Sequence, residues 1–383
     1  MKKIKTALVA SAVLAASAAH AQSSVTLYGI IDAGLMYTNN VSKSGTKGAL
    51  IQATSGNISG SRFGFRGAED LGNGLKAIFV LENGFNVQSG KLGQDGREFG
   101  RQAFVGLSST QFGTVTLGRQ YDTLVDFVAP LSATAGTFGD TGFAHPFDND
   151  NLNHSVRMSN AIKYTSNNYA GFKFGTLYSF SNSTNFADNR AYSFGASYNY
   201  GPLNVAAGYL QMNGSNSTAN TGGSVDVLES TANGTGGFLV GALRERVWGA
   251  GANYAFGPAL VGFVYTRSIY QGTQSFGSTN GAMSFDNFDL NAKYQLTSAV
   301  SLGIADVYTS GHAANSRTFG ADPKFNQVDL QAIYSLSKRT DVYAEGMYQH
   351  ASGKNYVAFI NTAGGASSTA NQVVGTVGMR VRF

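Results

Sequence analysis

The sequence predicts an all-β fold, a closed antiparallel barrel of sixteen strands that spans a membrane. Three observations predict it. The chain of 383 residues contains 49 Gly, 26 Phe and 19 Tyr; glycine disfavours helix interiors and aromatic residues favour strands. Segments of about ten residues alternate between apolar and polar side chains, which matches the length and period of a membrane-crossing strand. Short turns alternate with long polar connections, as in outer-membrane barrels.

The first 21 residues have the three parts of a secretory signal peptide. Three lysines among the first five residues form a basic start, an apolar run covers 7–19, and the letters AHA end the segment. The run is too short to span a bilayer, which takes about 20 residues. We therefore expect 1–21 to be a signal peptide cut before Gln22, and 22–383 to be one exported barrel.

Composition excludes several other classes of protein. Removing the three lysines of the signal lowers the formal net charge from +5 to +2, so the exported chain has no electrostatic basis for binding nucleic acid. The absence of cysteine excludes a disulfide scaffold and thiolate metal sites. No proline-rich linker or charge run divides the chain, which favours a single large domain.

The last segment, NQVVGTVGMRVRF (371–383), shows the alternation most clearly. One set of alternate residues reads VGVMVF and the other QVTGRR. Pairs of such segments joined by short turns predict hairpins. The predicted strands are 24–38, 59–68, 75–87, 98–108, 114–120, 156–166, 171–181, 192–200, 203–209, 248–256, 259–265, 288–294, 300–304, 328–336, 342–348 and 371–383.

The polarity of the two faces indicates which one is outside. Residues such as Asn291 and Asp329 would lie in the dry core of a soluble β-sandwich, where an unpaired charge is very costly. Turning the apolar face to lipid and the polar face to a water-filled lumen removes this conflict, although the sandwich remains the alternative. Asp306 has the apolar parity of its strand, and we expect a bulge or a strand end there.

A sheet in lipid can have no free edge, because its unpaired backbone groups would find no water. We therefore expect the last strand to pair with the first strand, 24–38. Phe383 would then lie at the membrane interface, in a girdle with aromatic residues at other strand ends. Those residues are Tyr200, Phe256, Tyr294 and Tyr334.

Three stretches and the terminal Phe383 resemble the general porins of β-proteobacterial outer membranes, the Bordetella, Burkholderia and Neisseria type. The stretches are SSVTLYGIIDAGL, SRFGFRGAEDLGNGLKAIFVLE and RQAFVGLSSTQFGTVTLGRQYD. The resemblance covers the whole exported chain. It implies a homotrimer of sixteen-stranded barrels, in each of which the third external loop folds into the lumen. That loop would be 121–154, and we expect it to narrow the pore.

Parity places five basic side chains on the lumen face, and the loop offers five acids opposite them. Such opposed walls would set a transverse field at the constriction, which disfavours apolar solutes. The alternative is that they are ordinary solvated lumen charges. The basic wall is Arg62, Arg66, Arg101, Arg157 and Lys163, and the acids are Asp122, Asp126, Asp140, Asp148 and Asp150.

The positions of the loop acids suggest that the basic wall dominates the field in the pore, which predicts a weak preference for anions. Asp148 and Asp150 lie in FDNDN, a turn-rich stretch that we expect to point toward solvent. Arg119 lies on the lipid parity of its strand, and the resemblance implies a role at a subunit interface. Tyr121, which opens the loop, is a candidate hinge anchor.

These features predict a passive channel for small hydrophilic solutes and ions in the outer membrane. Its expected partners are outer-membrane lipid, lipopolysaccharide and the barrel-assembly machinery, and we expect no nucleic acid and no cofactor. The alternative function is a binding barrel, an adhesin or phage receptor that uses its long loops. Catalysis is not expected, because the histidines are scattered without metal-ligand or nucleophile spacing. We expect no metal site, and the sequence leaves calcium binding by the loop acids open.

Overall fold

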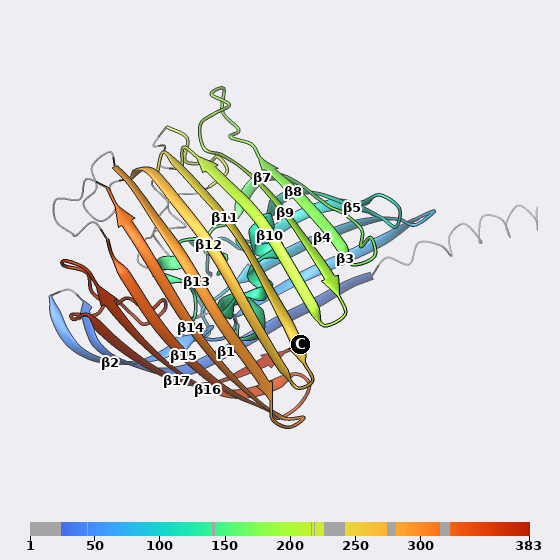
Figure 1. Ribbon diagram of the computed structural model, residues 1–383. Helices are drawn as coiled ribbons and strands as arrows, with labels where there is room; N and C mark the ends of the chain where they lie inside the picture. The colour runs from blue at the N-terminus through green and yellow to red at the C-terminus, as the bar shows by residue number, and fades with distance from the viewer. Residues whose placement is uncertain are drawn as a thin grey trace, which may run out of the picture.

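A computed structural model describes residues 24–43, 45–139, 142–215, 217, 219–225, 242–273, 281–314 and 322–383. It is an antiparallel barrel closed around a lumen (Figure 1). The signal peptide predicted at 1–21 lies outside the described residues. The described strands are β1 (Ser24–Lys43), β2 (Thr46–Ser55), β3 (Arg62–Gly72), β4 (Leu75–Gly84), β5 (Gln102–Ser109), β6 (Gly113–Gln120), β7 (Met158–Thr165), β8 (Phe172–Ser179), β9 (Arg190–Tyr200), β10 (Leu203–Asn213), β11 (Arg244–Phe256), β12 (Ala259–Thr273), β13 (Gly281–Gln295), β14 (Val300–Ala313), β15 (Lys324–Ser335), β16 (Thr340–Ser352) and β17 (Asn371–Arg382).

β2 and β3 together occupy one position in the barrel, so the wall has the predicted sixteen strands. Both pair with β1, β2 along its second half and β3 along its first half. Residues 56–61 between them leave the ladder. The Asp32 carboxylate on β1 holds this excursion, because its Oδ2 accepts the backbone N–H groups of Ile58 and Ser59 at 3.0 and 2.8 Å. No strand is predicted from the sequence at the position of β2.

The barrel closes between β1 and β17, as predicted. The register runs from Ile30 opposite Arg382 to Thr38 opposite Val374. Beyond it, Gly29 and Phe383 exchange both backbone hydrogen bonds at 3.0 Å. The Phe383 ring lies over Gly29, where any Cβ atom would collide with it. The alternation therefore continues to the last residue because that residue is still part of the wall.

β15 shows that the two faces have the predicted orientation. Gln327 and Asp329 are buried on the lumen side, whereas Val328 and Leu330 are exposed on the outer side. The expectation of a bulge at Asp306 is wrong. That residue lies within β14 in regular register with both neighbouring strands. Its exposed carboxylate accepts a hydrogen bond from Asn326 Nδ2 at 3.3 Å.

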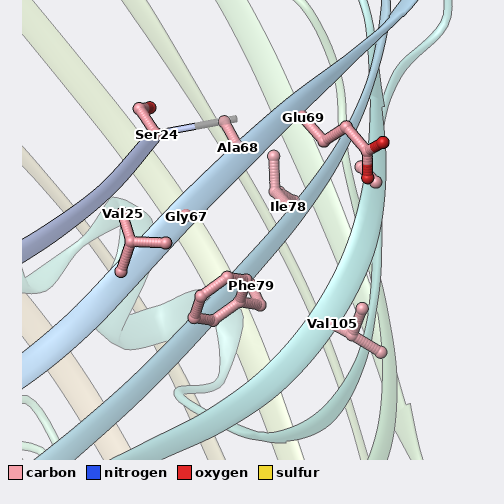
Figure 2. Close-up of a pocket in the computed structure, with 9 residues that line it drawn as sticks. Ser24, Val25, Gly67, Ala68, Glu69, Ile78, Phe79 and Val105 are labelled. Atoms are coloured by element: carbon pink, nitrogen blue, oxygen red, sulfur yellow. The ribbon is translucent and has the colours of Figure 1, made fainter. Parts of the chain in front are cut away.

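Apolar and aromatic side chains cover the outer side of the barrel. Figure 2 shows a shallow outer groove across β1, β3, β4 and β5, where Val25, Phe79 and Val105 stand around Gly67. The five aromatic residues predicted for a girdle are all exposed at strand ends. In the described part of the chain, no helix is long and apolar enough to cross a membrane.

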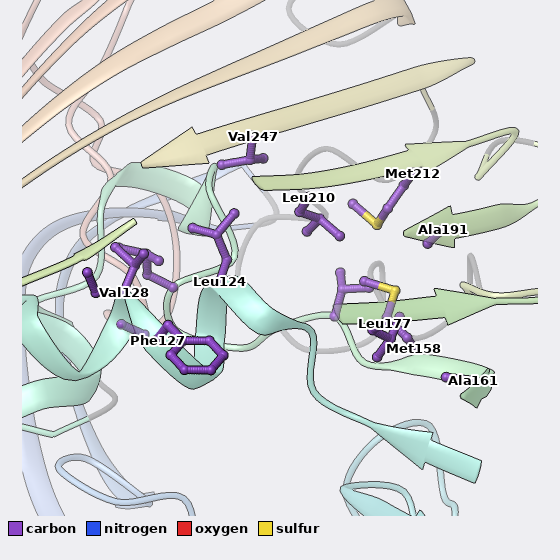
Figure 3. Close-up of a cluster of buried hydrophobic side chains, with 14 of the residues drawn as sticks. Leu124, Phe127, Val128, Met158, Ala161, Leu177, Ala191, Leu210, Met212 and Val247 are labelled. Carbon is purple, nitrogen blue, oxygen red and sulfur yellow. The ribbon is translucent and has the colours of Figure 1, made fainter. Parts of the chain in front are cut away.

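The β6–β7 segment, residues 121–157, packs against inward-facing side chains of the wall. Its helical turns are α2 (Thr123–Phe127), η1 (Ala129–Leu131), η2 (Ala133–Thr137) and η3 (Pro146–Asp148). Figure 3 shows Leu124 and Phe127 of α2 in one cluster with Leu177, Leu210 and Val247 from the wall. Gly195 on β9 permits this contact, because a Cβ atom there would lie 2.6 Å from the Phe127 ring. The lumen face therefore carries an apolar patch where α2 covers it.

Deleting Phe383 is expected to reduce the amount of folded protein in outer membranes, because it removes the last two hydrogen bonds of the β1–β17 seam. The measurement is the heat-modifiable band on gels of unheated membranes. Phe112→Ala, which removes an exposed aromatic ring from the β5–β6 turn, is the control. Equal recovery of both variants would contradict a role of Phe383 in closure.

Candidate functional site

Tyr121 opens the β6–β7 segment, and several charged or aromatic groups meet at it. Arg101 Nη2 donates to its hydroxyl at 2.9 Å, and the Arg157 guanidinium lies 5.5 Å from its ring centroid. The ring of His154 stacks on it at 5.1 Å. Lys163 Nζ donates to its carbonyl oxygen at 3.0 Å. Tyr121 therefore ties both ends of the segment to the wall, which fits the expected hinge anchor.

One residue of the predicted basic wall, Arg101, is paired with an acid that the sequence did not single out. Glu82 on β4 pairs with Arg101 at 2.8 Å and accepts the Tyr28 hydroxyl at 3.0 Å. Arg66 is exposed on the lumen side, with its guanidinium 5.3 Å from the centroid of the Tyr28 ring. Arg101 is thus a buried, paired cation, and Arg66 is the more solvent-accessible charge.

Arg62 lines a cavity of about 460 Å³ between the wall and the β6–β7 segment. Three further strand cations line it, namely Lys293, Arg380 and Arg382. No carboxylate is among the described residues that line this cavity. Asp341 lies close by, within 2.9 Å of Arg380 and 2.7 Å of Arg382. We call these four cations the basic cavity wall.

Sequence reasoning missed three members of the basic cavity wall. Arg380 and Arg382 stand on the polar parity of the last strand, and Lys293 on that of β13. The two-residue period that placed Arg62 and Arg66 on the lumen face could therefore have placed these three residues there as well. The period could not show which lumen residues lie close together, because Arg62 and Arg382 come together only through closure of the barrel.

The acids of the β6–β7 segment hold its fold rather than form a row of solvated charges. Asp122 is fully buried and caps α2, accepting from the N–H groups of Leu124 and Val125 at 2.7 and 3.3 Å. Its other oxygen accepts from Asn151 Nδ2 at 2.9 Å. Burial raises the pKa of Asp122 to about 6.

Asp148 and Asp150 are buried, so the expectation that they point toward solvent is wrong. Asp148 Oδ1 accepts from Asn153 N and Oδ2 from Ser155 N, at 2.9 and 3.0 Å. Burial, with the nearby Asp150 carboxylate, raises the pKa of Asp148 to about 7. A buried acid must be paired or hydrogen-bonded. Asp148 accepts its hydrogen bonds within the segment, whereas Asp150 contacts both His145 of the segment and Thr266 of the wall.

His145 is a buried cation between two carboxylates. Its Nδ1 lies 2.5 Å from Asp150 Oδ2, and its Nε2 lies 3.7 Å from Asp289 Oδ2 on β13. Burial alone would lower the pKa of His145, but the two carboxylates outweigh it and raise the pKa to about 10. Asp150 also accepts a hydrogen bond from Thr266 on β12. The contacts with Thr266 and Asp289 attach the segment to β12 and β13.

A second connection, 353–370, clamps the same part of the β6–β7 segment. Asn361 Nδ2 donates to the carbonyl oxygens of Ala144 and His145 at 2.9 and 2.8 Å. The rings of Phe147 and Phe359 stack with their centroids 4.8 Å apart. Phe147 has a φ of +66°, which is rare for a bulky residue and is held here by packing on both sides.

The remaining predicted residues have simpler surroundings. Asp126 pairs with Lys163 at 2.7 Å, so this acid and this base compensate each other. Asp140 lies outside the described residues. The Arg119 guanidinium bonds within its own chain, to Gly100 O and Ser159 Oγ, both at 2.8 Å. Among the described residues, no group of three or more potential ligands could hold a metal ion.

Comparisons with known sequences identify one family, and solved structures share the fold. The model of the Gram-negative porin family matches residues 6–354. An outer membrane porin of Bordetella pertussis is 36% identical, over 99% of this chain and 100% of that protein. Outer membrane porin protein 32 of Delftia acidovorans is 32% identical, over 99% and 100%. Among solved structures, an anion-selective porin from Comamonas acidovorans has a TM-score of 0.74 at 24% identity, covering 94% of this chain and 100% of that one. OmpT of Vibrio cholerae in a trimer form has a TM-score of 0.64 at 19% identity, over 94% and 99%.

Replacing His145 with Gln is expected to loosen the β6–β7 segment, because Asp150 and Asp289 would stay buried without a cation. Removing one partner of a buried pair typically costs about 3–5 kcal/mol. Limited proteolysis of the folded protein in detergent should then cut between Gly142 and Ser155. His350→Gln, a change on the exposed outer side of β16, is the control. Equal resistance of the two variants would rule out His145 as a fastening.

High pH is expected to break the same contact in the wild type. The pKa of His145 rises from 6.5 to about 10 on folding, so its ion pairs stabilise fully below pH 6.5 and are lost as the pH passes 10. Current noise of single open channels should increase from about pH 9 to about pH 11. His145→Gln should be noisy throughout, and a wild type that stays quiet would contradict the contact's role.

Proposed function

Because this chain belongs to the Gram-negative porin family, we propose that it is a general diffusion channel of the outer membrane with a weak preference for anions. Small hydrophilic solutes and ions would pass through the lumen passively. The family carries the channel function. The basic cavity wall is the single observation that carries the anion preference, because four cations line the cavity and no carboxylate is among its described lining residues. The cations are Arg62, Lys293, Arg380 and Arg382.

The charge balance of the cavity explains the sign of this preference. Arg101 is offset by Glu82 and Lys163 by Asp126, so these two residues of the predicted wall contribute little field. Arg62 and Lys293 line the cavity itself, and arginine keeps its charge under all relevant conditions. In a narrow lumen with low-dielectric walls, these charges attract anions over cations. Salt screens the effect.

The β6–β7 segment is proposed to narrow the lumen, since it occupies the inner side of β8–β13. Two hydrogen bonds support this. Asn291 Nδ2 donates to Leu131 O at 3.2 Å, and the N–H of Ala133 donates to Asp289 Oδ2 at 2.7 Å. Water and solutes would then pass between this segment and the basic cavity wall. No step of this passage calls for a catalytic group or a cofactor, and we propose that the chain is not an enzyme.

A homotrimer is the proposed assembly, supported by the family resemblance and by the trimer form of OmpT among the structural neighbours. Arg119 is kept as a candidate for the subunit interface. Lipid and lipopolysaccharide of the outer membrane, and the barrel-assembly machinery, are the proposed further partners. A binding barrel that uses its loops as an adhesin or phage receptor would be distinguished by the absence of conductance across a planar bilayer.

Reversing the charge of Arg62 and Lys293 to Glu is expected to turn the weak anion preference into a cation preference. The change leaves two cations and two anions on the basic cavity wall, with Asp341 beside them. Reversal potentials in a KCl gradient measure the shift, which should shrink as salt rises. Arg244→Glu/Arg246→Glu makes the same charge change on the outer side of β11 and should leave selectivity unmoved. A cation-selective wild type would contradict the proposal.

Shortening the β6–β7 segment within Ala133–Gly139 is expected to raise single-channel conductance, because the removed residues stand against β13 in the lumen. Deleting 183–187 from the connection between β8 and β9 is the matched control and should leave conductance unchanged. If the two deletions have the same effect in barrels that fold, the β6–β7 segment does not set the width of the pore.

A further inference from the structure

Strands β9–β12 are neighbours in the barrel wall (Figure 1). Four arginines lie near one end of these strands, on their outer side. We call Arg190, Arg244, Arg246 and Arg267 the outer arginine cluster. Their strand neighbours Ala191, Glu245, Val247 and Thr266 are buried on the lumen side. Because successive strand residues point to opposite faces, the four arginines point away from the lumen.

The register of the strands brings these side chains together. Arg190 and Arg244 both lie opposite Asn213 of β10, one on each side, so their backbones are about 10 Å apart. Arg246 lies opposite Ile269, two residues from Arg267, a diagonal relation of about 7–8 Å. Four positive charges therefore share a patch only three strand spacings wide.

Little within the described chain offsets this charge. Arg267 is paired with Asp286, whose two oxygens both lie 2.9 Å from its Nη1. No ion pair joins Arg190, Arg244 or Arg246 to an acid in the described ranges. The Nε atoms of Arg190 and Arg246 are buried without a hydrogen-bond partner there, and Arg190 rests on the Phe186 ring at 5.4 Å. Like charges this close repel, so an anion bound between these arginines would stabilise the patch.

The position of the cluster along the barrel indicates the kind of anion. Arg190 follows the connection 180–189 and Arg244 opens β11 after a long connection, whereas the opposite ends of these strands are joined by two-residue turns. In outer-membrane barrels the long connections are extracellular. Below the cluster, the outer face carries Phe194, Tyr209 and Trp248, an apolar surface suited to acyl chains.

We propose that the outer arginine cluster binds the phosphate groups of a phosphorylated glycolipid, lipopolysaccharide, in the outer leaflet. Arginine forks match phosphate oxygens bidentately and bind them more strongly than neutral donors do. Gln211 and Asn213, linked by a 2.7 Å hydrogen bond between the arginines, place amide groups at the same level for sugar hydroxyls. The assignment rests on the outer-membrane placement in the proposed function, but it is independent of the pore.

The test compares lipid binding by folded protein in detergent, measured by native mass spectrometry. The probes are lipid A with two phosphates, the same lipid A with its phosphates removed, and inorganic phosphate. The variant is Arg190→Gln/Arg244→Gln/Arg246→Gln, which spares the Arg267–Asp286 pair. Lys338→Gln/Arg339→Gln, in the short turn between β15 and β16, is the control. The outer arginine cluster does not line the pore. Single-channel conductance therefore reports on the pore separately.

The variant should bind bisphosphorylated lipid A at least about tenfold more weakly than the wild type and the control. Phosphate-free lipid A should bind all three proteins equally weakly, and inorganic phosphate should not bind measurably. Unchanged affinity of the variant, or equal affinity of the wild type for both forms of lipid A, overturns the proposal. Loss of oligomers with unchanged lipid affinity also overturns it, by assigning the cluster to contacts between copies. If the triple variant does not fold, Arg246→Gln alone decides by the same comparison.

Discussion

The seam between β1 and β17 is the constraint on which the rest of the structure depends. A strand edge in hydrocarbon leaves its N–H and C=O groups without water, and each unpaired group costs several kcal/mol. The chain satisfies these groups up to the pair formed by Gly29 and Phe383. Closure also places Arg62 of β3 in one cavity with Arg380 and Arg382 of β17. The same seam therefore seals the wall and assembles the charged side of the lumen.

The second consequence of closure is a lumen that must be filled without becoming a dry core. The β6–β7 segment achieves this with two kinds of contact. At one end, Leu124 and Phe127 bury apolar surface against β8–β11. At the other, His145, Asp150 and Asp289 form a buried ion network against β12 and β13. The apolar contact is non-directional. The ion network fixes one geometry, because moving one group away would leave an uncompensated buried charge.

Acidic and basic side chains occupy different places in this barrel. Asp122 and Asp148 of the β6–β7 segment are buried and hydrogen-bonded. Cations line the cavity beside it, and a separate set of arginines faces outward at the level of one leaflet. The low-dielectric wall between the two basic groups keeps their fields apart. The net charge of the whole chain therefore does not show its two localised positive regions, the basic cavity wall and the outer arginine cluster.

The sequence alone determined the architecture, because a strand between lipid and water needs apolar and polar side chains in alternation, and this alternation is visible in the sequence. Parity was enough to place Gln327 and Asp329 inside, Val328 outside, and Phe383 at the seam. It failed where a residue's environment is set by segments far away in the chain. Asp148 and Asp150 read as solvated turn residues, yet Asn153, Ser155 and His145 surround them. Lys293 and Arg380 stood on the right face, but only the tertiary structure brought them beside Arg62, since the periodicity of a strand specifies a face and not a neighbour across the lumen.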